Sequence, residues 1–505
     1  MNNNKLFSLV VPFFVLVLMF VFVGAGQAET VTIATSSEAM TLDPIMYNET
    51  PTNSVNFNMY EALTILDTEM NVQPCLAKSW ENEDKLTWVF HLRKGVKFHN
   101  GNKFTAEDVK FSMNRALTHP KSQYKSTLAE VDTIKVRDKY TVAIKTKYPY
   151  PILAKKLKSI FIFDSDYVKN HSDQYLATHE NGTGPYKLEK WVKDNKMVLK
   201  AYENYWQEKA DIEKVVLKPI TNAATRVASL LSGQADVVID LPVQDVDKVK
   251  EAEGVEALTR PSLRLIFLGM NTQKGPFAKK KVRKAVYHAI NEKAIIKQVM
   301  NGHAYAAGQF YPEMVFGYNS DIERVEYDPQ KARKLLKEAG YPNGFSITFD
   351  ASNNRYVNDG QIAQAVAIQL AKVGINVKLK VQPKSSFYDK VLSRNTNFYM
   401  LGWSNSNGDG SGTLEDLLHT PTEKYGRFNL GNYSNEKIDT LVEKAAKTLD
   451  KEKRRDIMQK AVKIAIEDVA QIPLHYQQQL YGVKKNIEWE PRPDKYLRVY
   501  SMDLK

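Results

Sequence analysis

Strand and helix patterns alternate between positions 328 and 403, and this alternation restricts the fold more than any other feature of the sequence. Apolar residues predict a strand at 345–349, a helix at 362–370 and a second strand at 375–381. A third strand is predicted at 398–403. Strands that are joined by helices lie parallel in one sheet, so the pattern predicts an α/β protein.

Two further helices belong to this stretch. Asp328 suits the N-cap of a helix, Pro329 suits its first residue, and Gly340 suits the residue after its end. A short helix is predicted at 385–394, between the second and third strands. The sequence from 340 to 403 therefore contains a complete βαβ unit.

The loops of such a unit carry the functional information, because parallel strands place all their strand-to-helix loops at one edge of the sheet. The loop Asn353 to Tyr356 and the loop that starts at Trp403 are expected to share this edge. An arginine, aromatic rings and small polar side chains would then line one crevice. The alternative is that both loops are ordinary solvated turns, and the pattern alone leaves it open.

Composition narrows the class of protein. A length of 505 residues corresponds to three domains or slightly more at about 150 residues each. With 43% hydrophobic and 25% charged residues, and one long apolar run, the chain is globular and has no set of membrane spans. The single cysteine, Cys75, excludes an internal disulfide, a cysteine zinc site and an iron–sulfur cluster.

The apolar run is at the N-terminus. Lys5 precedes it, Leu6 to Val23 form it, and small residues from Gly24 to Ala28 follow. This order predicts a signal peptide at 1–28 that is cleaved after Ala28, which would leave a periplasmic protein. The alternative is an uncleaved anchor, since the apolar run is long for a signal peptide.

The net charge is +12, and removal of residues 1–28 takes away one lysine and leaves +11. The densest basic cluster, Lys279 to Lys284, falls on a predicted amphipathic helix with Val282 and Val286 on its other side. We interpret this cluster as a solvated helix face. An exported chain rarely meets nucleic acid, so none is expected as a partner.

Motifs for catalysis or cofactor binding are absent. The sequence has no GxxxxGK[ST], GxGxxG, GxSxG or HExxH pattern, and its nine histidines lack the spacing of metal ligands. Positions 405–416 fit a calcium loop in part only, because Asn405 replaces the usual first Asp and Asp416 replaces the last Glu. We therefore predict neither an enzyme, nor a metal site, nor a cofactor.

Several motifs resemble one family in their order along the chain. Its most specific signature is matched by Pro74 to Trp80, Trp88 to Gly101 and Phe104 to Val109. Shorter matches lie before and after it: Thr41 to Pro44, Tyr60 to Leu63, Gly182 to Tyr186, Asn204 to Trp206, Leu230 to Asp236, Met270 to Asn271, Pro276 to Phe277, Val282 to Ala285 and Ala339 to Tyr341. On these residues the chain resembles the extracytoplasmic peptide-, glutathione- and nickel-binding proteins of ABC importers.

The resemblance implies a large three-domain periplasmic-binding-protein fold of type II, with two lobes that close on a ligand cleft. The implied division is a first-lobe core at 29–70, 185–268 and 481–505, an extra subdomain at 71–184 and a second lobe at 269–480. The protein is expected to be a monomer. It would deliver its ligand to a permease complex in the inner membrane.

The resemblance also implies a binding site. Arg355 matches the arginine that holds the peptide carboxylate in dipeptide-binding relatives, whereas the acid after Gly402 and Trp403 that would hold the amino group comes only at Asp409. The loops look closer to glutathione-binding relatives, so a short peptide or a glutathione-like compound is the expected ligand. The expected site consists of Asn271, Asn354, Arg355, Tyr356, Trp403, Ser404, Asn405, Ser406 and Asp409. The alternatives are a receptor for a nickel chelate, haem or another small solute, and a secreted hydrolase.

Overall fold

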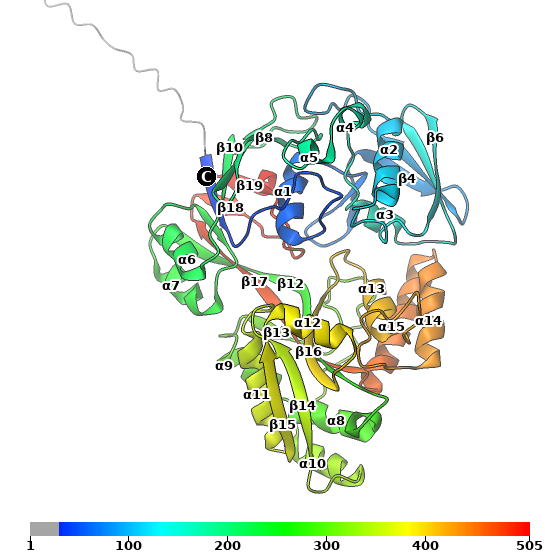
Figure 1. Ribbon diagram of the computed structural model, residues 1–505, viewed down its shortest axis with the longest axis vertical. Coiled ribbons are helices and arrows are strands. Elements are labelled where there is room, and N and C mark those ends of the chain that lie inside the picture. Colours follow the sequence, from blue (N-terminus) through cyan, green and yellow to red (C-terminus); the bar gives the residue numbers. More distant parts are fainter. Residues whose placement is uncertain (1–29) are drawn as a thin grey trace, which may run out of the picture.

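A sheet of eleven strands runs through both lobes of the molecule in the computed structural model, which describes residues 30–505 (Figure 1). The predicted signal peptide at 1–28 lies outside the described residues. The strands of this sheet follow one another in the spatial order β15 (Ile375–Gln382), β14 (Phe345–Ser352), β16 (Phe398–Ser404), β12 (Val255–Met270), β17 (Gln471–Lys484), β11 (Val237–Ile239), β1 (Thr30–Thr35), β10 (Lys214–Pro219), β9 (Lys196–Ala201) and β8 (Tyr186–Val192), and β13 (Ala304–Ala306) pairs with β17.

Two long antiparallel strands connect the lobes. Figure 1 shows β12 and β17 running from the upper lobe into the lower one. Residues 255–261 of β12 pair with 478–484 of β17, and residues 265–269 pair with 471–476, but the register shifts between Pro261 and Leu265. This irregularity lies where the two lobes meet.

The upper lobe carries a second sheet and several short helices. Its four-stranded sheet has the order β4 (Ala77–Asn82), β5 (Thr87–Leu92), β7 (Thr141–Thr146) and β6 (Val131–Asp138), with α2 (Ala106–Thr118) packed on it. The remaining elements are α1 (Thr50–Met59), β2 (Thr64–Leu66), β3 (Val72–Pro74), α3 (Leu153–Leu157), α4 (Ser165–Lys169), α5 (Asp173–Leu176), α6 (Ala223–Leu231), η1 (Val243–Asp245), α7 (Val246–Glu251), β18 (Ile487–Trp489), η4 (Val499–Ser501) and β19 (Met502–Leu504).

The lower lobe contains the predicted βαβ unit. β14 runs parallel to β15 from Phe345 opposite Ile375 onwards, and it pairs in parallel with β16 at Asp350 and Tyr399. The helices of this lobe are η2 (Pro276–Ala278), α8 (Lys280–Ala289), α9 (Glu292–Gln298), α10 (Pro329–Glu338), α11 (Asp359–Ala371), α12 (Lys384–Leu392), α13 (Ser411–Thr413), the π-helical η3 (Leu414–Leu418), α14 (Glu436–Lys447) and α15 (Lys451–Glu467). The predicted α/β architecture with two lobes is confirmed.

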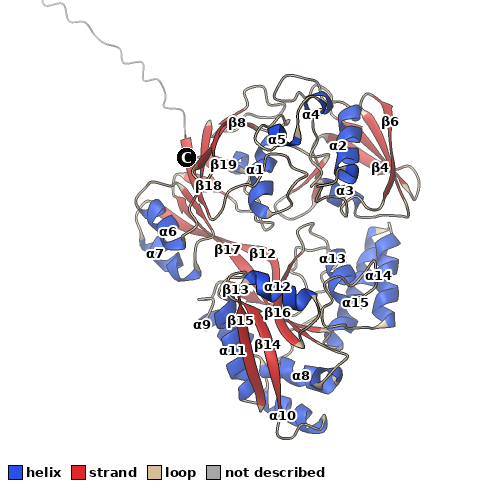
Figure 2. Cartoon of the chain, in the orientation of Figure 1, coloured by secondary structure: helices blue, strands red, loops and turns tan. Residues whose placement is uncertain are grey.

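In the lower lobe, residues 265–270 of β12 and 398–401 of β16 are buried on both faces, whereas β15 at the edge of the sheet exposes alternate residues. Figure 2 shows the helices around these strands. On β12, Ile266 and Leu268 belong to one apolar cluster with α8, α10 and α11, whereas Leu265 and Phe267 belong to another with α12, α14 and α15. Alternate residues of a strand point to opposite faces, so one strand contributes to two cores. The two cores hold the sheet from both faces, and with it the edge from which the loops after β14 and β16 extend.

The local signals for the helices are mostly confirmed. The carboxylate of Asp328 accepts hydrogen bonds from the backbone N–H groups of Gln330 and Lys331 at 3.0 and 2.8 Å, and α10 begins at the next residue, Pro329. One side chain of the basic cluster differs from the prediction. Arg283 is buried, and its guanidinium donates hydrogen bonds to the carbonyls of Phe277 and Val469. It is therefore not part of the solvated helix face.

No helix within residues 30–505 is both long enough and apolar enough to cross a membrane. The division into domains stays a proposal. The apolar side chains of the upper lobe's core and of its four-stranded sheet form one cluster, so these two parts fold against a shared core.

Candidate functional site

A cavity of about 500 Å³ opens between the lobes beside the connecting strands. We call it the cleft. The lower lobe contributes Arg355, Tyr356, Val357, Ser404 and Ser406, the connecting strands contribute Ser262, Leu263, Arg264 and Gln477 to Leu480, and the upper lobe contributes Asn48, Glu49, Thr50, Asn53, Asp240, Leu241, Pro242 and Pro493 to Tyr496. The cleft therefore lies at the carboxyl edge of β14, as the predicted sheet implies.

The backbone of Arg355 is held in place by the side chain of Asp359. It lies in the loop between β14 and α11, and Asp359 accepts hydrogen bonds from the N–H groups of Arg355 and Tyr356 at 3.0 and 3.2 Å. The same carboxylate oxygen accepts from the hydroxyl of Ser352 at 2.7 Å. One buried aspartate thus fixes the loop that presents the guanidinium to the cleft.

Tyr356 forms the floor beneath this guanidinium. The centre of its ring lies 5.1 Å from the Arg355 guanidinium carbon, and its hydroxyl is 2.9 Å from that of Tyr388. A Cβ atom at Gly402 would lie 2.5 Å from the Tyr356 ring, so this position admits only glycine while the ring stays where it is. Gly402 thus contributes to the site by leaving room for the Tyr356 ring.

The guanidinium carbon of a second arginine, Arg264, lies 5.9 Å from the centre of the same ring. It belongs to the irregular part of β12, opposite Ser404 of β16. Burial, together with the nearby charge of Arg355, lowers the pKa of Arg264 below its usual value. Within residues 30–505, neither guanidinium has a hydrogen bond or an ion pair.

Arg264 is not among the residues that the sequence predicted for the site. The available signal was a single charged residue within the otherwise apolar run from Leu263 to Met270. A charge in a buried strand needs a partner, because an unpaired ion in a low-dielectric interior is costly. The cleft thus presents two guanidinium groups that could each bind an anionic group.

The upper lobe faces these arginines with acids. Glu49 is exposed at the cleft and accepts a hydrogen bond from Thr52 at 3.2 Å. Asp240 follows β11 and is paired with Lys495 at 2.5 Å and with the hydroxyl of Ser36 at 2.7 Å. Burial opposes the ionisation of Asp240, but Lys495 outweighs it, so the pKa of Asp240 lies below its usual value.

The structure divides the other expected site residues. Ser404 and Ser406 line the cleft together with Arg355 and Tyr356. Asn354 is exposed and accepts a hydrogen bond from the N–H of Lys384 at 2.8 Å, outside the cleft lining. Trp403 packs on Phe428, with 5.2 Å between the ring centres.

The remaining three residues are buried, and the hydrogen bonds that they make lie outside the cleft. Asn405 accepts from the hydroxyl of Thr413 at 2.6 Å. Asp409 receives two hydrogen bonds from Arg454, at 2.9 and 2.7 Å. Asn271 follows the far end of β12 and binds Asn397. None of the three lines the cleft, so they do not belong to the site that we propose below.

The described part of the chain contains no group of three histidine, cysteine, aspartate or glutamate side chains that could hold a metal ion. The charged and polar side chains of the cleft lining offer recognition by charge and hydrogen bonds. Its lower side carries the guanidinium groups of Arg264 and Arg355, and its upper wall carries Glu49 beside the ion pair of Asp240 and Lys495.

The sequence matches the bacterial extracellular solute-binding proteins, family 5 (middle region), over residues 71–425. The chain belongs to this family. Among curated relatives of this solute-binding protein, the glutathione-binding protein GsiB of Salmonella choleraesuis (strain SC-B67) is 30% identical over 476 residues, which cover 92% of each chain. Family membership confirms the resemblance and the role in solute binding that it implied.

Solved structures of similar proteins confirm the fold class, a type II periplasmic binding protein. HbpA2 from Haemophilus parasuis has a TM-score of 0.85 at 27% identity, covering 94% of this chain and 100% of its own. DppA from Helicobacter pylori, an ABC transporter-associated periplasmic binding protein in complex with the peptide STSA, has a TM-score of 0.78 at 27% identity, covering 94% of this chain and 98% of its own. Solute-binding proteins of this family serve transport, so the secreted hydrolase is not supported.

Proposed function

We propose that this protein is the periplasmic binding component of an ABC importer for short peptides, with glutathione as the leading ligand. The mature protein would begin near Glu29, act as a monomer and deliver its ligand to an inner-membrane permease. The observation that carries the proposal is the pair Arg264 and Arg355, two guanidinium groups beside one tyrosine ring that have no ion pair within residues 30–505.

The charges of glutathione suit this arrangement. Glutathione carries two carboxylates and one ammonium group, and a guanidinium offers a carboxylate two parallel hydrogen bonds. Glu49 on the opposite wall, which has no ion pair in the described chain, suits the ammonium group. A ligand with a negative end and a positive end would thus bridge the two lobes. The similarity of this chain to the glutathione-binding protein GsiB adds support for glutathione.

The test is calorimetry with glutathione and with its C-terminal amide. We expect Arg355→Ala and Arg264→Ala each to weaken glutathione binding by about 2–5 kcal/mol, since each leaves a buried carboxylate unpaired. Arg355→Lys should recover part of the loss, because an ammonium group cannot supply the two-bond fork. The matched control is Arg333→Ala, an exposed arginine of α10 in the same lobe.

Two results would contradict the proposal. Unchanged affinity in both cleft variants would mean that the arginines do not hold the ligand. Equal affinity of the parent protein for glutathione and for its amide would mean that this cleft does not recognise the C-terminal carboxylate.

A further inference from the structure

A second cavity of about 500 Å³ lies between the four-stranded sheet of the upper lobe and the lower lobe. It shares no lining residue with the cleft. Its lining consists of Met70, Asn71, Val72, Trp80, Trp88, Pro151, Ala154, Lys155, Glu313 to Tyr318, Gly408, Asp409, Leu449, Lys451, Arg454 and Arg455. A volume of this size is typical of small-molecule sites.

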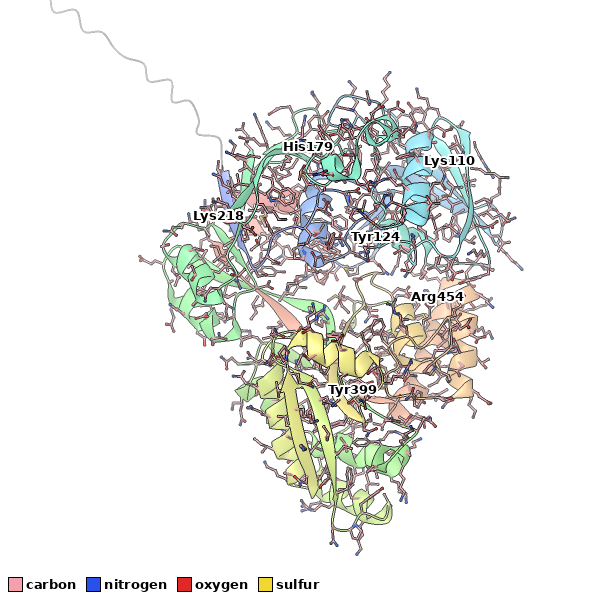
Figure 3. All side chains as sticks on the ribbon, in the orientation of Figure 1. Lys110, Tyr124, His179, Lys218, Tyr399 and Arg454 are labelled. Atoms are coloured by element: carbon pink, nitrogen blue, oxygen red, sulfur yellow. The ribbon has the colours of Figure 1, made fainter. Side chains whose placement is uncertain are left out.

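The walls of this second cavity are aromatic on both sides. Trp80 and Trp88 come from the hairpin β4–β5 of the upper lobe, and Phe316 and Tyr318 come from the long loop after β13 in the lower lobe. Figure 3 shows Arg454 at the end of α15 that faces the upper lobe. The cavity therefore offers flat apolar surfaces from two lobes, which suits a planar apolar group.

Basic side chains gather on one side of these walls. The charged groups of Lys155, Arg454 and Arg455 lie 5.8, 5.1 and 5.2 Å from the centre of the Phe316 ring. Asp409 neutralises Arg454 and Glu452 neutralises Arg455.

Two lysines of the lining can still bind an anion. Lys155 donates to the carbonyl of Gly408 at 2.7 Å and lies 4.0 Å from the carboxylate of Asp409, which already binds Arg454. Lys451 is exposed at the rim and has no ion pair within the described chain. Burial lowers the pKa of Lys155, as expected for an ammonium group with incomplete compensation.

We propose that the second cavity binds a small organic anion with a planar apolar body and one carboxylate, with the body between the tryptophans and Phe316 and the carboxylate toward Lys155. Such a ligand would contact both lobes. The loop after β16 would sense it, because Ser404 and Ser406 line the cleft while Gly408 and Asp409 line the second cavity. Its site is separate from the peptide cleft, and the inference does not depend on which peptide binds there.

The test uses trans-cinnamate as the probe, with cinnamamide and acetate as comparison compounds. Calorimetry should detect binding of cinnamate to the full mature protein, and cinnamamide and acetate should each bind at least about tenfold more weakly, because each lacks one half of the recognised group. Lys155→Met should weaken cinnamate binding by a similar factor. The matched control is Lys156→Met, the next residue, which does not line the cavity.

A second measurement needs no variant in the cavity. In protein labelled with nitrogen-15 at its six tryptophans, cinnamate should shift the indole resonances of Trp80 and Trp88. The same shifts should occur in Arg355→Ala, which removes a cleft residue.

Three outcomes would overturn the inference: no binding of cinnamate to the parent, equal binding of cinnamamide, or loss of the shifts in Arg355→Ala. The last would place the probe in the peptide cleft.

Discussion

Arg355 and Asp409 are both charged loop residues in the sequence, but their surroundings in the fold are opposite. The guanidinium of Arg355 has no ion pair in residues 30–505 and lines the cleft, whereas the carboxylate of Asp409 is buried and bound by Arg454. A paired and buried charge stabilises the fold only as long as both partners remain. A charge without a partner in a cleft is available to a ligand. The ion-pair partners thus separate structural charges from binding charges.

Asp409→Ala should destabilise the fold and leave the cleft intact. Burial opposes the ionisation of Asp409, but Arg454 outweighs it and holds the pKa at about 2. Removal of the carboxylate leaves Arg454 buried and unpaired, which should lower the free energy of unfolding by about 3–5 kcal/mol. Urea unfolding would measure this, with Glu452→Ala, an exposed acid of α15, as the control. Unchanged stability combined with lost peptide binding would show that Asp409 acts on the ligand.

His475→Leu should not destabilise the protein at pH 7. His475 in β17 is fully buried, and neither ring nitrogen has a hydrogen-bond partner among the described residues. Replacing an unsatisfied polar ring by an apolar side chain removes a desolvation cost of about 1–3 kcal/mol. We expect an equal or higher free energy of unfolding in urea. A loss above about 1 kcal/mol would indicate that the ring makes a stabilising contact.

The same variant should alter the acid sensitivity of the protein. Burial and the charge of Arg324 lower the pKa of His475 to about 3, whereas the unfolded chain has a pKa near 6.5. Between these values the unfolded state binds one more proton, so stability falls as the pH falls from about 6.5 to about 3. At pH 5 the parent should have lost about 2 kcal/mol more than His475→Leu, relative to pH 7. Parallel pH profiles of the two proteins would contradict this.

At the scale of the element, the loop between β14 and α11 works as one unit. Asp359, at the first turn of α11, ties Ser352, Arg355 and Tyr356 together through one carboxylate oxygen. The aspartate itself does not line the cleft, so it is a positioning residue. The loop holds its shape before any ligand arrives, which lowers the entropy cost of binding.

Asp359→Ala should therefore weaken peptide binding through Arg355. We expect at least about a tenfold loss of affinity, because small displacements of a two-bond clamp remove its hydrogen bonds. In the Arg355→Ala background the same substitution should have little further effect, since the group that it positions is gone. The control is Asp389→Ala, an exposed acid of α12. Full additivity of the two losses would show that Asp359 acts on the ligand independently of Arg355.

For the whole molecule, the connecting strands decide how the lobes move. β12 and β17 carry the chain across the cleft, and their pairing shifts at the residues that line it, between Pro261 and Leu265. Interrupted backbone pairing is the part of a sheet that bends with the least loss of hydrogen bonds. The cleft and the bending point therefore coincide.

A ligand should close the two lobes. Because it contacts both walls, small-angle scattering should show a smaller radius of gyration when glutathione is bound. Binding to the folded state alone should also raise stability by about 2.7 kcal/mol at a hundredfold excess over Kd. Stabilisation with an unchanged radius would mean that the protein binds its ligand without closing.

The sequence by itself determined the elements and the family. Capping residues at Asp328 and Pro329, the apolar periodicity of the βαβ unit and the ordered motifs all act over short distances along the chain, so one-dimensional patterns reveal them. The sequence also predicted four residues of the cleft lining, because parallel strands bring the loops that follow them to one edge of the sheet. These residues are Arg355, Tyr356, Ser404 and Ser406.

The tertiary structure alone decided which charges are free. Arg454 lies 45 residues from Asp409, and Arg264 lies in a strand whose pairing gives no local signal. Whether a charge is neutralised depends on distances in space, and these are set by the packing of segments that are far apart in the sequence. For this reason the sequence led us to expect Asp409 in the cleft lining and to leave out Arg264.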